Sequence, residues 1–587
     1  MAIKQGLYAG DFETTTTSDD VRVWASCLVD INTCETAFIG NDIDSFFDFL
    51  KNKNSVVYFH NLKFDGEFIL SYLLTKGYRY TDTRESGTFE TLITDDGIFY
   101  SITVYFEKKN KKYKKVVFYD SLKKLPFKVS VISKTFELPD EKLIIDYKKY
   151  RPIGHELTPE ERQYIINDCK IIAGALRIQF EKGLTKMTNA SDALNGYKTI
   201  IDKRNFERWF PVLPVELDAD IRKAYKGGFT YLNPIYKNKR VKKGVVLDVN
   251  SLYPSRMYDC VLPYGYPMFF EGEPKTDDNY PLFIVRLSCA FRIKPNHIPT
   301  IQLKNNRAYI ETEYLSSSEI NGLLEIVEMT LTSVDLELFL EHYDTYNLNY
   351  ICGWKFKGVT GMFKDYIDYW MNIKETSTGA IRQLAKLMLN SLYGKFATNP
   401  KARKKIPVMD NDEIVRYQLD DPELRNPVYT AMGCFITAYA RDKTIRSAQS
   451  VFDRFIYADT DSLHLKGLKL PKNLEIHPTH LGAWKHEGNF CDSKYIRAKT
   501  YLETMVETTT DTLNNYCKLL NKSFDVFREN GVIRYKELKV TCAGMPDNIK
   551  RFVTYRNFKS GTTFDGKLVP KRYKGGVILT ETTFTIK

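Results

Sequence analysis

The sequence has no apolar run long enough to cross a bilayer, and no long apolar segment precedes its first acidic residues. We therefore expect neither a membrane-spanning helix nor a secretory signal, and we expect a soluble protein that works inside a cell. None of its ten cysteines forms a Cys-X-X-Cys pair, which argues against a zinc site and a disulfide framework. No segment repeats at a fixed period, which excludes a solenoid.

What the chain does contain is a hydrophobic fraction of 43% and an aromatic fraction of 14% over 587 residues. That composition excludes a mostly disordered protein, and the length exceeds what one hydrophobic core can organise, so several domains are expected. The formal charge of +12 predicts an anionic partner, because an excess of Lys and Arg on a folded surface attracts negative charge. Nucleic acid is favoured over a membrane.

Acidic residues follow two expected strands near the N-terminus. Asp11 and Glu13 lie two apart at the end of the strand-like stretch GLYAGDFET, and Asn61 and Asp65 follow the strand-like VVYFH. Taken alone, each acid could be an ordinary surface residue, because an Asp-X-Glu pair is common. Their order along the chain, DFETT, then HNLKFDG, then YIIND, is much harder to obtain by chance.

A helix is predicted in the stretch TPEERQYIINDCKIIAGAL, where Thr158 and Glu161 form a capping box. Tyr164 and Asp168 are four residues apart on it, so they share a face. The four acids of these segments can therefore converge on one site. Four carboxylates without a local basic partner suit a pair of hard Mg²⁺ or Mn²⁺ ions, and two ions about 3.5–4 Å apart are the usual machinery for cleaving a phosphodiester.

A further acid, Asp248, ends the β-branched stretch in GVVLDVNSLYPS, where a turn and then a helix follow. An acid in that position is costly to bury unless it is paired or binds a metal ion. The backbone after it can hold phosphate as a helix N-terminus does. Tyr253 offers a flat ring on which a sugar can lie.

The stretch TGAIRQLAKLMLNSLYGKFATNP has the periodicity of a long helix. Cations reaching a triphosphate and a Tyr stacking on a base would explain the residue types on its polar face. A solvated basic face is the ordinary alternative, although such a face would more often carry Glu. The polar face comprises Arg382, Lys386, Asn390 and Tyr393, and the apolar face comprises Ala385, Met388, Leu389 and Leu392.

Two acids, Asp459 and Asp461, interrupt the apolar and β-prone stretch FIYADTDSLHL. On a strand the two would share a face and repel one another unless a cation lies between them. In a hairpin, Asp-Thr-Asp-Ser is ordinary turn chemistry. Together with Asp248 they would form a second two-metal site, suited to nucleotidyl transfer.

Two short motifs add support. AYKGGF places Tyr225 beside Gly227 and Gly228, whose small size lets backbone approach a ligand, although a Gly-Gly turn is the ordinary alternative. RAKTYLE supplies Lys499 and Tyr501, a cation and a ring that suit a primer end.

Together these motifs resemble those of the protein-primed family B DNA polymerases of phi-twenty-nine-like bacteriophages. The resemblance covers nearly the whole chain, through DFETTT, YFHNLKFDG, YDSLKKLPF, YKGGFTYLN, DVNSLYP, QLAKLMLNSLYGKFA, YADTDS, AKTY, GGVIL and TFTIK. It implies a multidomain protein of the α/β and α+β classes, with an RNase H-like 3′–5′ exonuclease domain and a right-hand polymerase of palm, fingers and thumb. It also implies two family-specific insertions.

The resemblance implies bounds for each domain. The first insertion would contact a priming protein and DNA, and the second would support processivity and strand displacement. The bounds are 1–188 for the exonuclease domain, 189–262 and 428–541 for the two parts of the palm, 263–361 for the first insertion, 362–400 for the fingers, 401–427 for the second insertion and 542–587 for the thumb.

Roles for single residues are implied in the same way. The exonuclease metal ligands would be Asp11, Glu13, Asp65 and Asp168, with Tyr164 orienting the water and Lys142 assisting. The single-stranded primer end would meet His60, Asn61, Phe64 and Phe68. Polymerase metal ions would be held by Asp248, the Val249 carbonyl and Asp461, with Asp459 beside them. The incoming nucleotide would be bound by Tyr253, Lys374, Arg382, Lys386, Asn390 and Tyr393, where Arg382 replaces the Lys that the family often has.

The resemblance further implies two Mg²⁺ ions per active site, which Mn²⁺ can replace, and a replicative enzyme that starts synthesis on a separate terminal protein. Expected partners are primer-template DNA, deoxynucleoside triphosphates, the terminal protein and a phage single-stranded DNA-binding protein. The expected setting is a monomer in the cytoplasm of an infected bacterium.

Two other functions remain open at the level of sequence. A stand-alone exonuclease whose C-terminal half only grips DNA would leave Asp248, Asp459 and Asp461 without a task. A non-enzymatic single-strand binder is suggested by 39 Tyr, 36 Phe and the basic balance, but it would have no use for convergent acids. Nucleotide incorporation on a primed template excludes both.

Overall fold

The computed structural model describes residues 5–106, 114–301, 317, 319–320, 323–508, 525–529 and 532–587.

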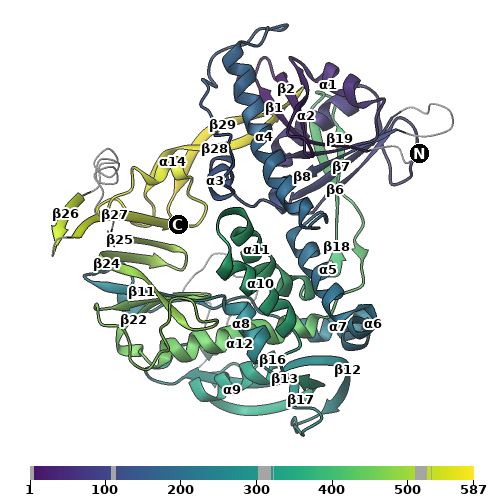
Figure 1. Ribbon diagram of the computed structural model, residues 1–587. Helices are drawn as coiled ribbons and strands as arrows, with labels where there is room; N and C mark the ends of the chain where they lie inside the picture. Colours follow the sequence, from purple (N-terminus) through teal and green to yellow (C-terminus); the bar gives the residue numbers. More distant parts are fainter. Residues whose placement is uncertain are drawn as a thin grey trace.

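A mixed eight-stranded sheet is formed by the N-terminal part of the chain, coloured purple to blue in Figure 1. The strand order is β3-β2-β1-β4-β8-β7-β6-β5, with β4 parallel to both β1 and β8. The strands are β1 (Gly6–Thr14), β2 (Val23–Asp30), β3 (Thr36–Gly40), β4 (Ser55–Phe59), β5 (Arg79–Tyr80), β6 (Thr88–Ile93), β7 (Phe99–Tyr105) and β8 (Lys115–Asp120).

Helices cover both faces of this sheet. Alternate side chains of its central strands point to opposite sides and are apolar on both, so each face needs a cover. Ala9 and Tyr58 belong to the apolar core that includes α4, whereas Tyr8 and Val57 belong to the core that includes α1 and α2. The expected capping box is present at the start of α4: Thr158 Oγ1 accepts from the Glu161 N–H, and the Glu161 carboxylate accepts from the Thr158 N–H. The helices are α1 (Ile43–Leu50), α2 (Leu62–Thr75), α3 (Val129–Thr135) and α4 (Pro159–Glu181).

A second large sheet is antiparallel and lies on the left of Figure 1. Its order is β26-β27-β25-β24-β11-β23-β22-β9, with β10 paired to β24. The strands come from two distant stretches of chain, which are joined here by the pairing of β11 with β23 and β24. They are β9 (Thr230–Leu232), β10 (Arg240–Val241), β11 (Gly244–Val249), β22 (Phe455–Asp459), β23 (Ser462–Lys466), β24 (Trp484–Arg497), β25 (Thr500–Thr508), β26 (Asp525–Glu529) and β27 (Val532–Cys542).

Helices pack between and around the two large sheets. In α11 the expected apolar face is confirmed, since Ala385, Met388, Leu389 and Leu392 are all buried. Met388, Leu389 and Leu392 belong to the same core as α4, α5 and α12, so the N-terminal domain and the later helices share apolar contacts. The helices are α5 (Asn189–Ile201), α6 (Lys203–Trp209), α7 (Val215–Arg222), α8 (Leu252–Asp259), α10 (Lys364–Thr376), α11 (Gly379–Phe396), α12 (Thr430–Gln449) and α14 (Asp547–Lys550).

The ranges predicted as insertions each carry small sheets of their own. A four-stranded sheet, β12-β17-β13-β16, with α9 (Ser333–His342), lies within the first; it consists of β12 (Leu262–Glu271), β13 (Leu282–Ile293), β16 (Val327–Thr332) and β17 (Tyr343–Val359). A two-residue pair, β14 (Glu319–Ile320) with β15 (Leu323–Leu324), lies there as well. The second insertion holds two pairs, β18 (Lys401–Ala402) with β21 (Glu423–Leu424), and β19 (Lys405–Met409) with β20 (Val415–Leu419).

The chain ends in a long hairpin, β28 (Thr563–Tyr573) and β29 (Gly576–Thr585), which reaches from α14 up to the N-terminal domain in yellow in Figure 1. β29 packs beside α2. The lysine-rich stretch EKKNKKYKKV, which we expect from its sequence to be a solvated hairpin tip, falls mostly on residues outside the described ranges. Within those ranges, no helix is long and apolar enough to cross a membrane.

Candidate functional site

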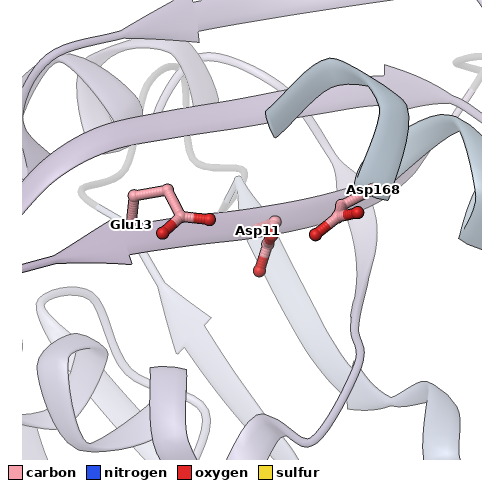
Figure 2. A group of neighbouring side chains, drawn as sticks. All are labelled: Asp11, Glu13 and Asp168. Carbon is pink, nitrogen blue, oxygen red and sulfur yellow. The ribbon is translucent and has the colours of Figure 1, made fainter. Parts of the chain in front are cut away.

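Three carboxylates from two elements meet where β1 faces α4 in the N-terminal domain. Asp11 and Glu13 lie on β1 and Asp168 lies on α4, and one oxygen of each is within 4.8 Å of the others. Figure 2 shows the strand presenting Glu13 and Asp11 in a row, with the helix bringing Asp168 beside them. Asp65, on α2, is buried close to Asp11. The two-residue spacing on β1 and the helix face thus converge as expected.

Burial makes the ionised form of these groups costly. Loss of solvent, followed by the charge of Asp168, raises the pKa of Asp11 to about 7. Loss of solvent and the neighbouring Asp11 raise the pKa of Glu13 and of Asp65 well above the ordinary range. A bound cation would remove both penalties, because it replaces lost hydration and offsets the mutual repulsion.

The donor set fits a divalent ion on a further observation. Asp168 Oδ1 is buried and has no hydrogen-bond partner among the residues that the structure describes. Its other oxygen accepts from Lys142 Nζ, which also donates to Tyr164 Oη at 2.9 Å. An unpaired buried carboxylate oxygen is costly, so a metal ion on Oδ1 would complete the site. Carboxylate oxygens are the ligands that Mg²⁺ prefers.

A cavity of about 800 Å³ surrounds the cluster. Among the residues expected to hold a primer end, His60, Asn61 and Phe64 line it. Both ring nitrogens of His60 are engaged, Nδ1 with Ser121 Oγ at 2.9 Å and Nε2 with the Phe127 carbonyl at 2.8 Å. The ring of His60 is therefore held in place as part of the cavity wall, which Phe64 also lines.

Phe68 departs from the expectation that it contacts the primer end. Its side chain is only 1% exposed and lies in the apolar core beneath Phe64, with ring centroids 5.7 Å apart. In this structure Phe68 supports Phe64 and does not line the cavity.

Some residues line this cavity although the sequence did not single them out. They include Thr15, Tyr147, Lys148, Leu568, Ile578, Leu579 and Glu581. Tyr147 and Lys148 belong to an irregular loop, and the last four come from the C-terminal hairpin, so periodicity carries no signal for them.

A second cavity, of about 870 Å³, opens at the centre of the antiparallel sheet. It gathers side chains from β11, α8, α10, α11 and the loop after β22. Lys485 and Glu487, on β24, also line it; Lys485 pairs across the sheet with Asp248, and only the strand register reveals this. The expected residues that line it are Asp248, Val249, Tyr253, Lys374, Arg382, Lys386, Asn390, Tyr393 and Asp461.

Asp248 and Asp461 are brought together by the backbone. The N–H of Val249 donates to the Asp461 carbonyl at 2.8 Å, which ties the end of β11 to the acidic turn. Burial, followed by the charge of Asp461, raises the pKa of Asp248 to about 7, and burial also raises the pKa of Asp461. Two desolvated carboxylates that repel one another again suit a cation, so the donor set fits a metal site.

The strand interpretation of Asp459 and Asp461 is wrong. Asp459 ends β22, Ser462 begins β23, and the two pair across a tight turn in which Thr460 has a φ of 59°. The turn leaves Asp461 in the lining of the cavity and Asp459 outside it. Asp459 accepts from Lys499 Nζ at 2.8 and 2.9 Å and does not line the cavity, so as placed here it fixes Lys499 and is not positioned as a metal ligand.

Cations and stacked rings form the wall opposite the acids. The rings of Tyr253 and Tyr393 stack with centroids 3.9 Å apart. Lys374 Nζ donates to Ser251 Oγ at 3.0 Å, and Arg382 Nη1 donates to the Lys374 carbonyl at 2.6 Å. Burial and the nearby Arg382 and Lys386 lower the pKa of Lys374. Such a group of neighbouring cations suits a polyanionic ligand.

The shorter motifs pack around the acidic turn. A Cβ on Gly228 would lie 2.6 Å from Thr460 Oγ1, so this glycine is needed for the turn to approach. Arg441 donates to the carbonyls of Lys226 and Gly227 at 2.8 and 2.9 Å. The ring of Tyr225 packs against the largest core, and none of the three expected motif residues Tyr225, Gly227 and Gly228 lines the cavity.

Tyr501 is likewise placed inside the protein. Its ring packs against those of Tyr457, His464 and Tyr495, with centroids 5.1 to 5.4 Å apart. It therefore supports the strand that carries Asp459, and Lys499 alone presents the polar end of this motif next to the turn. Contact of either residue with a primer stays a prediction.

Comparison with known proteins gives consistent results. A family model described as DNA polymerase type B, organellar and viral, matches residues 48–151 and 107–477. The chain is similar to the DNA polymerases of Bacillus phage phi29 (47% identity) and Bacillus phage M2 (46%), each over 99% of both chains, and to that of Streptococcus phage Cp-1 (34%, over 99% and 98%). Among solved structures it is similar to phi29 DNA polymerase complexed with primer-template DNA and incoming nucleotide, with a TM-score of 0.91, 46% identity and coverage of 99% and 100%.

Proposed function

The chain belongs to the type B DNA polymerases of organelles and viruses. We propose that one of its two acid-lined cavities adds nucleotides to a primer and that the other removes them. The chain is a DNA-directed DNA polymerase. The observation that carries the division is that, within the described part of the chain, the two cavities share no lining residue. Each cavity has its own carboxylates, so each can hold its own metal ions.

Nucleotide addition belongs to the cavity of Asp248 and Asp461. These two carboxylates and the Val249 carbonyl would hold the divalent ions that such polymerases use; we assign Mg²⁺, with Mn²⁺ able to replace it. When bound, the ions activate the primer hydroxyl and neutralise charge on the triphosphate. The group of cations opposite the acids binds the triphosphate, and the Tyr253–Tyr393 stack supports the sugar and base of the incoming nucleotide.

Removal of nucleotides belongs to the cavity of Asp11, Glu13 and Asp168, where Asp65 completes the acid set. Lys142 neutralises Asp168 and holds the Tyr164 hydroxyl, which is placed to orient an attacking water. Phe64 offers a ring on which the last base of a single strand can stack. The site thus performs 3′–5′ trimming of a primer end.

The two alternative functions are not supported. A stand-alone exonuclease and a non-enzymatic strand binder both leave the cations and acids of the second cavity without a task. The relatives named DNA polymerase match over 99% of this chain, so no half of it stands outside the resemblance.

We further propose that synthesis begins on a hydroxyl of a separate terminal protein, in the cytoplasm of an infected bacterium. The four-stranded sheet of the first insertion offers an apolar surface for a protein, because Tyr266, Met268 and Phe269 on β12 are 56%, 42% and 48% exposed. The hydroxyl of a Ser, Thr or Tyr presents the same nucleophile as a primer end, so Asp248 and Asp461 serve both. A phage single-stranded DNA-binding protein would cover the displaced strand.

One assay tests these proposals. On a primed single-stranded template with Mg²⁺, we expect extension when nucleotides are present and shortening from the 3′ end when they are absent. Without a DNA primer, but with the terminal protein from the same genome, we expect a labelled nucleotide to become attached to that protein. Extension without any shortening would contradict the exonuclease assignment, and an unlabelled protein would contradict priming.

Replacing Lys386 with Ala should raise the KM for the incoming nucleotide. Lys386 lines the cavity of Asp248 and Asp461 on the exposed face of α11. A charge-assisted contact is worth about 1.5–3 kcal/mol, so an increase of about tenfold to a hundredfold is expected. Steady-state kinetics of single-nucleotide addition measures it. Lys364→Ala, on α10 and outside the cavity, is the matched control, and an unchanged KM in Lys386→Ala would favour the solvated-face interpretation.

A further inference from the structure

The tip of the C-terminal hairpin is wedged into the N-terminal domain. A Cβ on Gly575 would lie 2.1 Å from the Val21 carbonyl oxygen, and a Cβ on Gly576 would lie 2.4 Å from the Phe68 ring. Gly575 also has a φ of +93°, which other residues rarely adopt. The tip therefore approaches the loop before β2 and the helix α2 as closely as backbone can.

An ion pair next to these glycines joins the hairpin to α2. Arg572 Nε donates to both carboxylate oxygens of Glu67 at 2.9 Å, and Arg572 Nη2 lies 2.8 Å from Glu67 Oε1. Glu67, on α2, is 3% exposed, and Arg572 is the one cation that pairs with it among the described residues. A two-point contact between guanidinium and carboxylate fixes orientation as well as distance.

The second insertion also contacts the ion pair. The Arg572 guanidinium lies 4.6 Å from the centroid of the Tyr417 ring, which comes from β20 of the second insertion. That ring in turn packs edge-on against Phe99 of β7, with centroids 6.2 Å apart. Nearer the surface, Lys574 pairs with Glu413 of the same insertion. One arginine thus contacts the exonuclease helix and the second insertion at once.

The ion pair lies behind the helix that presents an acid to the trimming cavity. Asp65 and Glu67 are two residues apart on α2, about 200° around the helix axis, so Asp65 faces the cavity while Glu67 faces the hairpin. The same hairpin supplies Leu568, Leu579 and Glu581 to the wall of that cavity. Where the hairpin lies therefore decides the shape of the cavity.

We propose that Arg572 is a positioning residue for strand trimming: by pairing with Glu67 under Tyr417, it holds the hairpin as one wall of the exonuclease cavity. The role rests on the proposed exonuclease function of that cavity. It concerns how a single strand is bound, because Arg572 touches none of the four acids. Without Arg572 the buried Glu67 carboxylate loses its counter-charge, and a buried unpaired charge is strongly destabilising. The hairpin tip should therefore separate from α2.

The test compares variants of the full-length protein in the trimming assay. In Arg572→Ala we expect the KM for a single-stranded oligonucleotide to rise about tenfold, with kcat and single-nucleotide addition changed by less than about twofold. Hydrogen exchange in residues 563–585 should become faster. Glu67→Gln, which keeps the shape and removes the charge, should act in the same direction, and the exchanged pair Glu67→Arg with Arg572→Glu should restore KM.

Lys571→Ala is the matched control, since Lys571 precedes Arg572 on the same strand and packs on Tyr573. It should leave KM and exchange unchanged. Unchanged KM in both Arg572→Ala and Glu67→Gln would overturn the positioning role, as would an equal loss in the exchanged pair. If the double variant Asp11→Ala with Glu13→Ala loses trimming while Arg572→Ala does not, the positioning role alone fails. If that double variant still trims, the exonuclease assignment fails and the positioning role fails with it.

Discussion

The variant Asp461→Ala is expected to slow nucleotide addition at least about a thousandfold while trimming of single strands continues at its normal rate. Asp461 and Asp248 are the two half-buried aspartates that line the second cavity, and Asp459 does not line it. Loss of a ligand costs several kcal/mol of transition-state stabilisation, since the remaining carboxylate cannot hold both ions. Asp248→Ala should have the same effect.

Single-turnover extension and 3′ shortening, measured on one preparation of each variant, decide the outcome. Asp453→Ala is a matched control, because Asp453 lies in the same domain, is exposed and does not line the cavity. Loss of both activities in a folded Asp461→Ala protein would show that the two sites are coupled, against the division proposed here. Extension at the normal rate would remove Asp461 from the site altogether.

The double variant Asp11→Ala with Glu13→Ala should have the converse effect, with trimming reduced at least about a thousandfold and extension intact. These side chains provide two of the three oxygens that lie within 4.8 Å of one another. The substitution should not unfold the protein, because burial and mutual repulsion already oppose the ionised forms of both acids. A thermal melt in the presence of a chelator verifies this.

Degradation of a 5′-labelled single strand measures the loss. The matched control is Glu35→Ala with Asp82→Ala, which removes two exposed acids from the same domain, away from the cavity. Trimming at the normal rate by the double variant would refute the exonuclease assignment. Extension that fails along with trimming would indicate a folding defect or a shared site.

Local patterns in the sequence predicted several features correctly. The face of α11 follows from the 3.6-residue period, and the start of α4 follows from its capping box, because each depends on residues within a few positions. Convergence of Asp11, Glu13 and Asp168 was predicted from the two-residue spacing on one expected strand and from the face of an expected helix. In FIYADTDSLHL the sequence permitted both a strand and a turn, and the pairing of Asp459 with Ser462 across the turn selected the turn.

Other features had no local signal. Phe68 has the residue type of a base-stacking ring, but the hairpin β28–β29 and Phe64 cover it. Lys499 has the type of a DNA contact and pairs with Asp459, 40 positions away. The pair of Glu67 and Arg572 joins residues 505 positions apart, and no periodicity relates them.

By itself the sequence determined the secondary structure around each acid and the chemistry that the acids and cations can perform, since hydrophobic period, turn residues and side-chain charge are properties of short segments. Only the tertiary structure decided which acids share a cavity, that Asp459 pairs with Lys499 and lies outside the cavity that Asp461 lines, and that the C-terminal hairpin forms one wall of the cavity of Asp11, Glu13 and Asp168. Those outcomes depend on how sheets and helices pack, and packing brings together atoms whose separation along the chain carries no information about their distance in space.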